Sequence, residues 1–121
     1  MRFDNKLPIY AQIVNYIKGK IISKEYDVGE KLPSVRELSS QLKVNPNTIQ
    51  RSYGELELEG LVYTKRGMGT FVIEDEKLII AVRKNMAEEL VDEFLDSMGV
   101  LGISHKEIVS LIQKNGGYKG E

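Results

Sequence analysis

A polar run near the middle of the chain carries side chains that can hydrogen-bond to nucleic-acid bases. It places two amides, a hydroxyl and a guanidinium close together, on Asn47, Thr48, Gln50 and Arg51. Asn and Gln can pair with adenine, Arg with guanine or phosphate, and the methyl group of Thr with that of thymine. On the first turns of a helix, these residues could enter the major groove of duplex DNA. The alternative is a solvated helix face.

Three further cations and two glycines could extend such a surface. Arg36 is predicted at the start of a helix, whose free amide groups attract phosphate. Lys65 and Arg66 stand beside Gly67 and Gly69 in a predicted turn. Glycine lets the backbone approach a groove closely, and a cation there can enter the narrow minor groove. The alternatives are an ion pair within the helix for Arg36 and an ordinary charged turn for the others.

Two helices are predicted before the polar run. The first covers about residues 8–23, with a proline at the favoured first position and apolar residues at steps of three and four. Residues 24–32 are predicted to form a loop. The second helix begins with a capping box of Ser34 and Glu37 and ends near Leu42.

The polar run itself is predicted to open a third helix directly afterwards. Asn45 is a good N-cap that can also contact a phosphate, Pro46 suits the first helical position, and Gly60 ends the helix. The apolar positions expected on its buried side are Ile49, Tyr53, Leu56 and Leu58. Two helices joined by a three-residue turn are typical of a helix-turn-helix.

A β-hairpin is predicted after the third helix. Residues 61–64 and 70–73 are rich in β-branched and aromatic residues, and residues 65–69 between them carry two glycines and two cations. Three helices followed by a hairpin make a winged helix. The predicted fold class is therefore mainly α with a small β-hairpin, in which residues 1–74 form a winged helix-turn-helix and residues 75–121 a helical segment.

The helical segment is predicted to hold two copies of the chain together. A long helix carries apolar residues at steps of four, a pair of glycines at 99 and 102 breaks it, and a capping box of Ser104 and Glu107 opens a short final helix. The side chains expected to pair are Leu78, Val82, Met86, Leu90, Phe94, Met98, Ile108 and Leu111. One small domain cannot cover such a stripe, so we expect a homodimer that reads an inverted-repeat operator. Residues 115–121 are expected to be frayed.

The charge and composition favour a binding protein over an enzyme. Residues 1–73 carry a net charge of +3 and residues 74–121 a net charge of −4, which suits a front half that meets phosphate. The chain has no cysteine, no nucleotide-binding glycine motif and no catalytic triad, and we expect no cofactor or metal. His105 and the acidic residues 88–96 are expected to be solvated surface. Neither a signal peptide nor a membrane span is predicted, so the expected location is the cytoplasm.

Five segments taken together resemble the GntR family of bacterial regulators. They follow one another in unbroken order over about residues 6–73: PIYAQI at 8–13, GEKLPSVREL at 29–38, VNPNTIQRSYGEL at 44–56, EGLV at 59–62 and RGMGTFV at 66–72. The short remainder after the hairpin is similar to the YtrA subfamily, and this similarity implies dimerisation. In such families the residues equivalent to Arg36, Asn47, Thr48, Gln50, Arg51, Arg66 and Gly67 face the operator.

The resemblance implies a repressor that binds double-stranded DNA. A protein-docking role for the winged helix is the alternative, but a docking surface should be apolar where this chain is polar and basic. A small-molecule effector that lodges between the long helices of a dimer stays open as a further partner.

Overall fold

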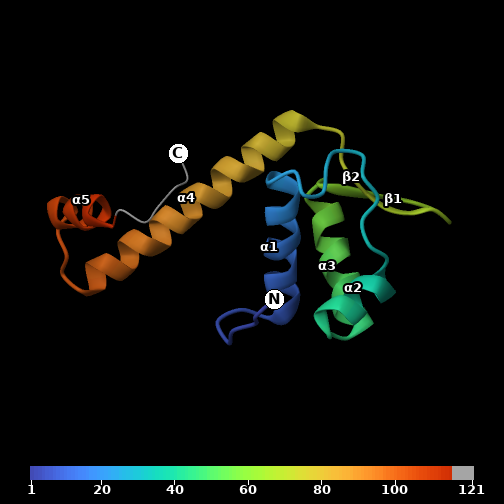
Figure 1. Ribbon diagram of the computed structural model, residues 1–121, viewed down its shortest axis with the longest axis horizontal. Coiled ribbons are helices and arrows are strands. Elements are labelled where there is room, and N and C mark those ends of the chain that lie inside the picture. The colour runs from blue at the N-terminus through green and yellow to red at the C-terminus, as the bar shows by residue number, and fades with distance from the viewer. Residues whose placement is uncertain (116–121) are drawn as a thin grey trace. The chain divides into compact units, whose positions relative to one another are not determined.

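The computed structural model describes residues 1–115 and confirms the predicted fold class (Figure 1). In chain order its elements are α1 Ile9–Ile22, α2 Val35–Leu42, α3 Pro46–Leu58, β1 Val62–Lys65, β2 Gly69–Val72, α4 Glu76–Val100 and α5 His105–Lys114. The chain divides into two compact units, Met1–Arg83 and Lys84–Glu121. The first unit is a winged helix-turn-helix. Residues 116–121, where most of the frayed tail is expected, lie outside the described residues.

The predicted caps set the two helices of the helix-turn-helix. The Ser34 hydroxyl accepts a hydrogen bond from the amide of Glu37 at 3.0 Å, and the Glu37 carboxylate accepts one from the amide of Ser34 at 2.9 Å. The bond from the Ser34 amide lowers the pKa of the Glu37 carboxyl, because it favours the charged form of that group. Lys43 ends α2 in the left-handed conformation, with φ 56°. This conformation turns the chain sharply enough for α3 to begin three residues later.

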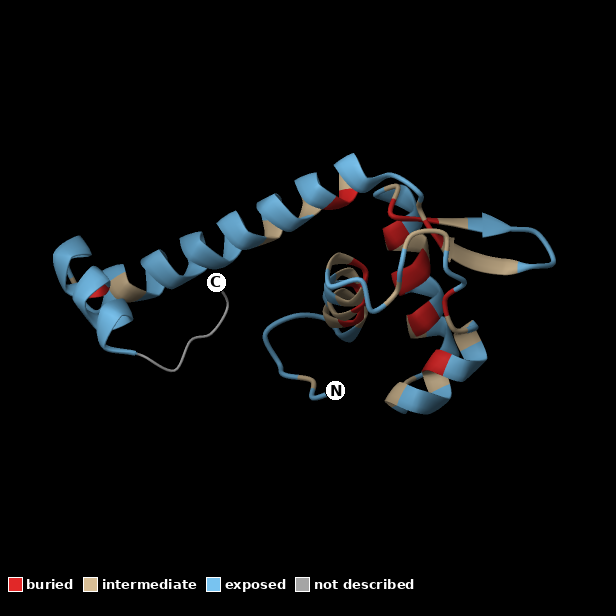
Figure 2. Ribbon diagram, turned by 45° about the horizontal axis from the view of Figure 1, so that its top comes forward, coloured by how far each residue is buried: buried red, intermediate tan, exposed pale blue. Residues whose placement is uncertain are grey.

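The core of the first unit lies between α1, α3 and the hairpin (Figure 2). Ile13 and Ile17 of α1 are fully buried, as are Ile49 and Leu56 of α3. The prediction for Leu58 is wrong, because this side chain is 84% exposed. Two helical positions after Leu56 lie about 200° further round the axis, so Leu58 points away from the side that Leu56 buries.

Part of the segment 24–32, predicted as a loop, pairs with the hairpin. The amide of Leu32 donates to the carbonyl of Thr70 at 2.8 Å, the amide of Val72 donates to the carbonyl of Glu30 at 2.9 Å, and Lys31 forms a bridge to Phe71. The hairpin itself is antiparallel, with Val62 opposite Val72 and Lys65 opposite Gly69. This stretch is short and has no strand periodicity, so the sequence could not predict that residues 30–32 pair with β2.

The first turns of α4 belong to the first unit. Ile79 is 3% exposed, and Leu78 and Val82 are partly buried against the same core. The sequence predicts that Leu78 and Val82 pair with a second copy, whereas the structure gives them contacts within their own chain. The unit also extends to Arg83, beyond the predicted boundary after residue 74.

The second unit contains the rest of α4 and α5. Gly99 lies inside α4, which ends at Val100, and Gly102 adopts a φ of 71° in the turn that follows. The predicted capping box of Ser104 and Glu107 opens α5. Ile108 is buried, whereas many other apolar side chains of this unit are exposed, namely Leu90, Val91, Phe94, Leu95, Val100, Leu101, Val109, Leu111 and Ile112. Among the described residues, no helix has the length and apolar character needed to cross a membrane.

Candidate nucleic-acid interface

One face of α3 presents the predicted base-reading side chains. Asn47, Gln50 and Arg51 are exposed and Thr48 is half-exposed, whereas Ile49 and Tyr53 on the other face are buried. The side-chain oxygen of Asn45 accepts a hydrogen bond from the amide of Asn47 at 2.8 Å, which confirms the predicted cap. A helix anchored by one face leaves the other free to enter a groove.

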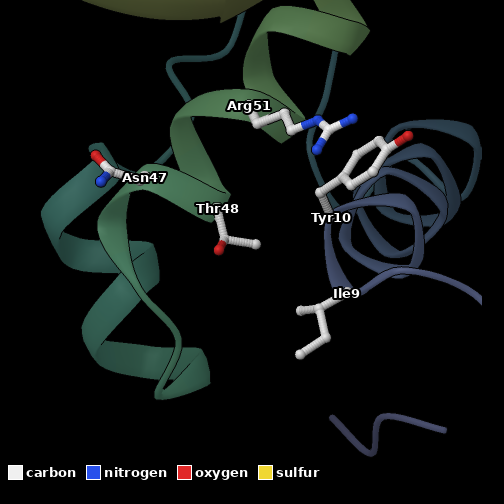
Figure 3. Close-up of a pocket in the computed structure, with 5 residues that line it drawn as sticks. All are labelled: Ile9, Tyr10, Asn47, Thr48 and Arg51. Carbon is white, nitrogen blue, oxygen red and sulfur yellow. The ribbon is translucent and has the colours of Figure 1, made fainter. Parts of the chain in front are cut away.

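The first turn of α1 completes this polar face. Ile9 and Tyr10 line a hollow of about 400 Å³ together with Asn47, Thr48 and Arg51 of α3. Figure 3 shows the Arg51 side chain reaching across to the ring of Tyr10, where the guanidinium carbon lies 3.6 Å from the ring centroid. A guanidinium stacked on an aromatic face is favourable, because the ring carries negative potential on its faces.

A buried hydroxyl ties α1 to α3 beneath this hollow. Ser52 is fully buried, and its hydroxyl lies 2.9 Å from the carbonyl oxygen of Thr48 and 3.0 Å from that of Tyr10. Neither Tyr10 nor Ser52 is among the residues predicted for the interface. Their positions far from each other in the sequence carry no signal of contact, and only the packing of α1 on α3 brings them together.

The start of α2 is fixed against α3 by Tyr53. Its phenol donates a hydrogen bond to the carbonyl of Pro33 at 2.5 Å, and burial of this side chain raises its pKa well above the usual value. Arg36, in the first turn of α2, is exposed. Within residues 1–115 it makes no ion pair. Its guanidinium is therefore available to an external anion.

The tip of the hairpin carries the predicted cations on a backbone that needs glycine. Gly67 and Gly69 have φ values of 77° and 123°, which side chains rarely tolerate. Lys65 and Arg66 are exposed, and the Lys65 ammonium lies 5.2 Å from the centroid of the Phe71 ring. That ring stacks on Tyr63 with centroids 5.7 Å apart, so an aromatic pair supports the tip.

Lys31 is a further cation at this tip that the sequence prediction missed. A Cβ atom at Gly69 would lie 2.7 Å from its Cε, so the Lys31 stem runs against the glycine backbone. Lys31 and Gly69 also line a groove of about 320 Å³ with the start of α2 and the hairpin residues Lys65 and Met68. The hairpin tip and the end of α2 that carries Arg36 therefore lie close together. The described residues contain no cluster of acidic or histidine side chains that could hold a metal ion.

Comparison with known proteins identifies the family to which this chain belongs. Residues 9–72 match the model of bacterial regulatory proteins of the gntR family. The transcriptional repressor YtrA of Bacillus subtilis is 34% identical over 108 residues, which cover 88% of this chain and 83% of YtrA.

Solved structures agree with this assignment. A GntR family transcriptional regulator from Listeria monocytogenes superimposes with a TM-score of 0.86 at 44% identity, covering 93% of this chain and 98% of that one. The DNA-binding domain of AraR, solved in complex with operator ORX1, matches with a TM-score of 0.55 at 34% identity, covering 59% of this chain and 92% of that domain. This chain, a winged helix-turn-helix with a polar α3 face and a basic glycine hairpin followed by a helical segment, belongs to the GntR family of DNA-binding bacterial transcription regulators.

Proposed function

We propose that this regulator is a homodimeric repressor that reads an inverted-repeat operator. In each half-site α3 lies in the major groove and the hairpin tip in the minor groove. The observation that carries the proposal is the row of exposed polar side chains at Asn47, Thr48, Gln50 and Arg51, above a buried face that anchors the helix. The repressor YtrA and the operator-bound domain of AraR support it as relatives.

The cations away from α3 have a different role in this proposal. Arg36 at the start of α2 contacts the phosphate backbone, as do Lys65 and Arg66 when the hairpin tip follows the minor groove. Phosphate contacts fix the position of a protein on the duplex without reading sequence, whereas the α3 side chains read base edges. Gly67 and Gly69 let the hairpin backbone approach the groove closely.

The pairing surface of the proposed dimer lies in the second unit. Leu90 is 64% exposed, Phe94 38% and Leu111 48%, and Met86 and Met98 are half-buried on the same stripe. So many exposed large apolar side chains in one small unit are unfavourable in water, and a second copy of the chain would cover them. Since Leu78 and Val82 pack within their own unit, the proposed surface begins after Arg83.

Selection of bound sequences from a randomised duplex library tests the proposal. We expect the full chain to enrich two half-sites in inverted orientation, with affinity that falls steeply as salt rises because each phosphate contact releases a counterion. A variant with both Arg51→Ala and Arg66→Ala should lose this enrichment, and Lys106→Ala on α5 serves as the matched control. Enrichment of a single half-site, or binding that salt does not change, would contradict the proposed function.

A further inference from the structure

The ring of Tyr10 sits under the guanidinium that is placed to read a base. The two groups come from different helices, and 3.6 Å between the guanidinium carbon and the ring centroid is stacking contact (Figure 3). Tyr10 is half-buried, whereas Arg51 is exposed. Within residues 1–115 Arg51 makes no ion pair, and its guanidinium contacts the Tyr10 ring instead.

Tyr10 is itself held in place by the core. Its carbonyl oxygen lies 3.0 Å from the buried Ser52 hydroxyl of α3, one helical residue after Arg51. The following turns of α1 are anchored by Ile13 and Val14, which are 0% and 6% exposed. The ring and the guanidinium thus extend from two helices that are hydrogen-bonded to each other beside these two residues.

Stacking of this kind prepares an arginine for base recognition. A free arginine side chain populates many rotamers and loses that freedom when it binds, which weakens binding. A guanidinium that lies flat on a ring is already ordered, and its edge, which carries the N–H donors, stays open for a bidentate contact to guanine.

We propose that Tyr10 is a positioning residue that sets base preference at one operator position by holding Arg51 in its reading orientation. This inference rests on the proposed function, because it requires α3 to read bases. Two other roles for Tyr10 give different results in the same experiment. A phenol that contacts phosphate would act through its hydroxyl, and a ring that sequesters Arg51 would weaken DNA binding.

The probe is the duplex that the wild-type full chain selects from a randomised library, together with a panel in which each base pair is replaced in turn. We expect Tyr10→Leu to lower discrimination at one position in each half-site by roughly 3- to 10-fold, the cost of ordering one side chain. Discrimination elsewhere and binding to unrelated DNA should stay unchanged. Tyr10→Phe keeps the ring and should behave as wild type. Tyr16→Leu, a half-buried tyrosine further along α1, is the matched control.

A double-mutant cycle separates positioning from a general structural effect. In an Arg51→Ala background, Tyr10→Leu should cause no further loss, because the side chain that it positions is absent. Damage to the fold would instead lower binding to every duplex, in both backgrounds and by the same factor.

Each other result has a defined meaning. Unchanged discrimination in Tyr10→Leu, an equal loss in Tyr10→Phe, or tighter binding in Tyr10→Leu would each overturn the positioning role while leaving the operator-reading function intact. A wild-type chain that enriches no sequence would overturn the proposed function, and the inference with it.

Discussion

At the level of single residues, the interface divides into side chains with a partner in the chain and side chains without one. Arg51 rests on Tyr10 and Lys65 on the ring of Phe71, whereas Arg36 and Arg66 make no ion pair within residues 1–115. The stacked guanidinium of Arg51 keeps a defined direction, which suits the reading of bases, whereas Lys65 is held at the hairpin tip, where it can contact phosphate. Unpaired cations can follow the phosphate backbone, which suits the positioning of the whole domain.

Arg66→Ala tests this division at the hairpin tip. We expect it to weaken binding by a similar factor for all operator variants and to reduce the salt dependence of binding by about one counterion. Fluorescence anisotropy at several salt concentrations measures both quantities. Lys106→Ala, an exposed cation of the second unit, should change neither. A loss confined to one base position would show instead that Arg66 reads sequence.

At the level of elements, each helix of the helix-turn-helix depends on a cap and a neighbour. Ser34 caps α2, Asn45 caps α3, and the buried Ser52 hydroxyl bonds α3 to α1. The hairpin depends on the backbone bonds that Glu30 and Leu32 make to β2. Helix α3 is therefore held at its N-terminus by its cap and along one face by α1.

Removal of the α2 cap should change both stability and its dependence on pH. Ser34→Ala should lower the free energy of unfolding by about 1 kcal/mol, the usual effect of losing such a cap. Because the capping box lowers the pKa of Glu37, its contribution is complete above the ordinary carboxyl pKa and is lost as the pH falls through the lowered value. The variant should therefore lose less stability on acidification than the wild type. Urea unfolding at neutral and acidic pH measures this, and an identical acid response would contradict it.

The hairpin tip offers a second test at the level of elements. Gly69→Ala should destabilise the chain by about 1–3 kcal/mol, because its φ of 123° is strained for any side chain and the new Cβ would displace Lys31. Gly19→Ala is the matched control, since Gly19 lies in the last turn of α1 and a Cβ there meets nothing within 4 Å. That control should be stabilising by roughly 0.5–1 kcal/mol. Thermal unfolding distinguishes the two, and equal melting temperatures would argue against strain at Gly69.

At the level of the whole molecule, the two units have contrasting surfaces. The first has a buried apolar core and exposes polar groups on α3 and the hairpin, whereas the second buries only Ile108 among its described apolar residues and exposes a series of large apolar side chains. The second unit also exposes acidic residues, among them Glu88, Glu89 and Asp92, whose negative charge would repel the phosphates of DNA. This contrast supports one unit for operator contact and one for pairing between copies.

Substitution of two exposed apolar residues tests the pairing. Leu90→Gln combined with Phe94→Gln should shift the chain toward monomer, because it removes apolar surface that a second copy would cover. Sedimentation velocity measures the oligomeric state, and Lys84→Gln with Glu93→Gln on the same helix is the control. Affinity for a two-half-site operator should fall with dimer content, whereas affinity for one half-site should not. A stable dimer that survives the double substitution would place the interface elsewhere.

The sequence by itself determined the order of elements, the caps and the exposed polar face of α3. These features depend on residues that are close together in the chain: Ser34 with Glu37, Asn45 with Pro46, and the apolar periods that separate Ile49 and Tyr53 from Asn47, Gln50 and Arg51. Helical and strand periods act locally, so a local pattern is enough to predict them.

Only the tertiary structure decided which distant residues meet. It placed Tyr10 under Arg51, Lys31 against Gly69, and Leu78 and Val82 on the core of the first unit. It also exposed Leu58, whose apolar character alone suggested burial. Such contacts join elements separated by loops, and they follow from how the helices pack against one another and the hairpin. An apolar or aromatic residue seen in a sequence carries no record of the neighbour that it will find.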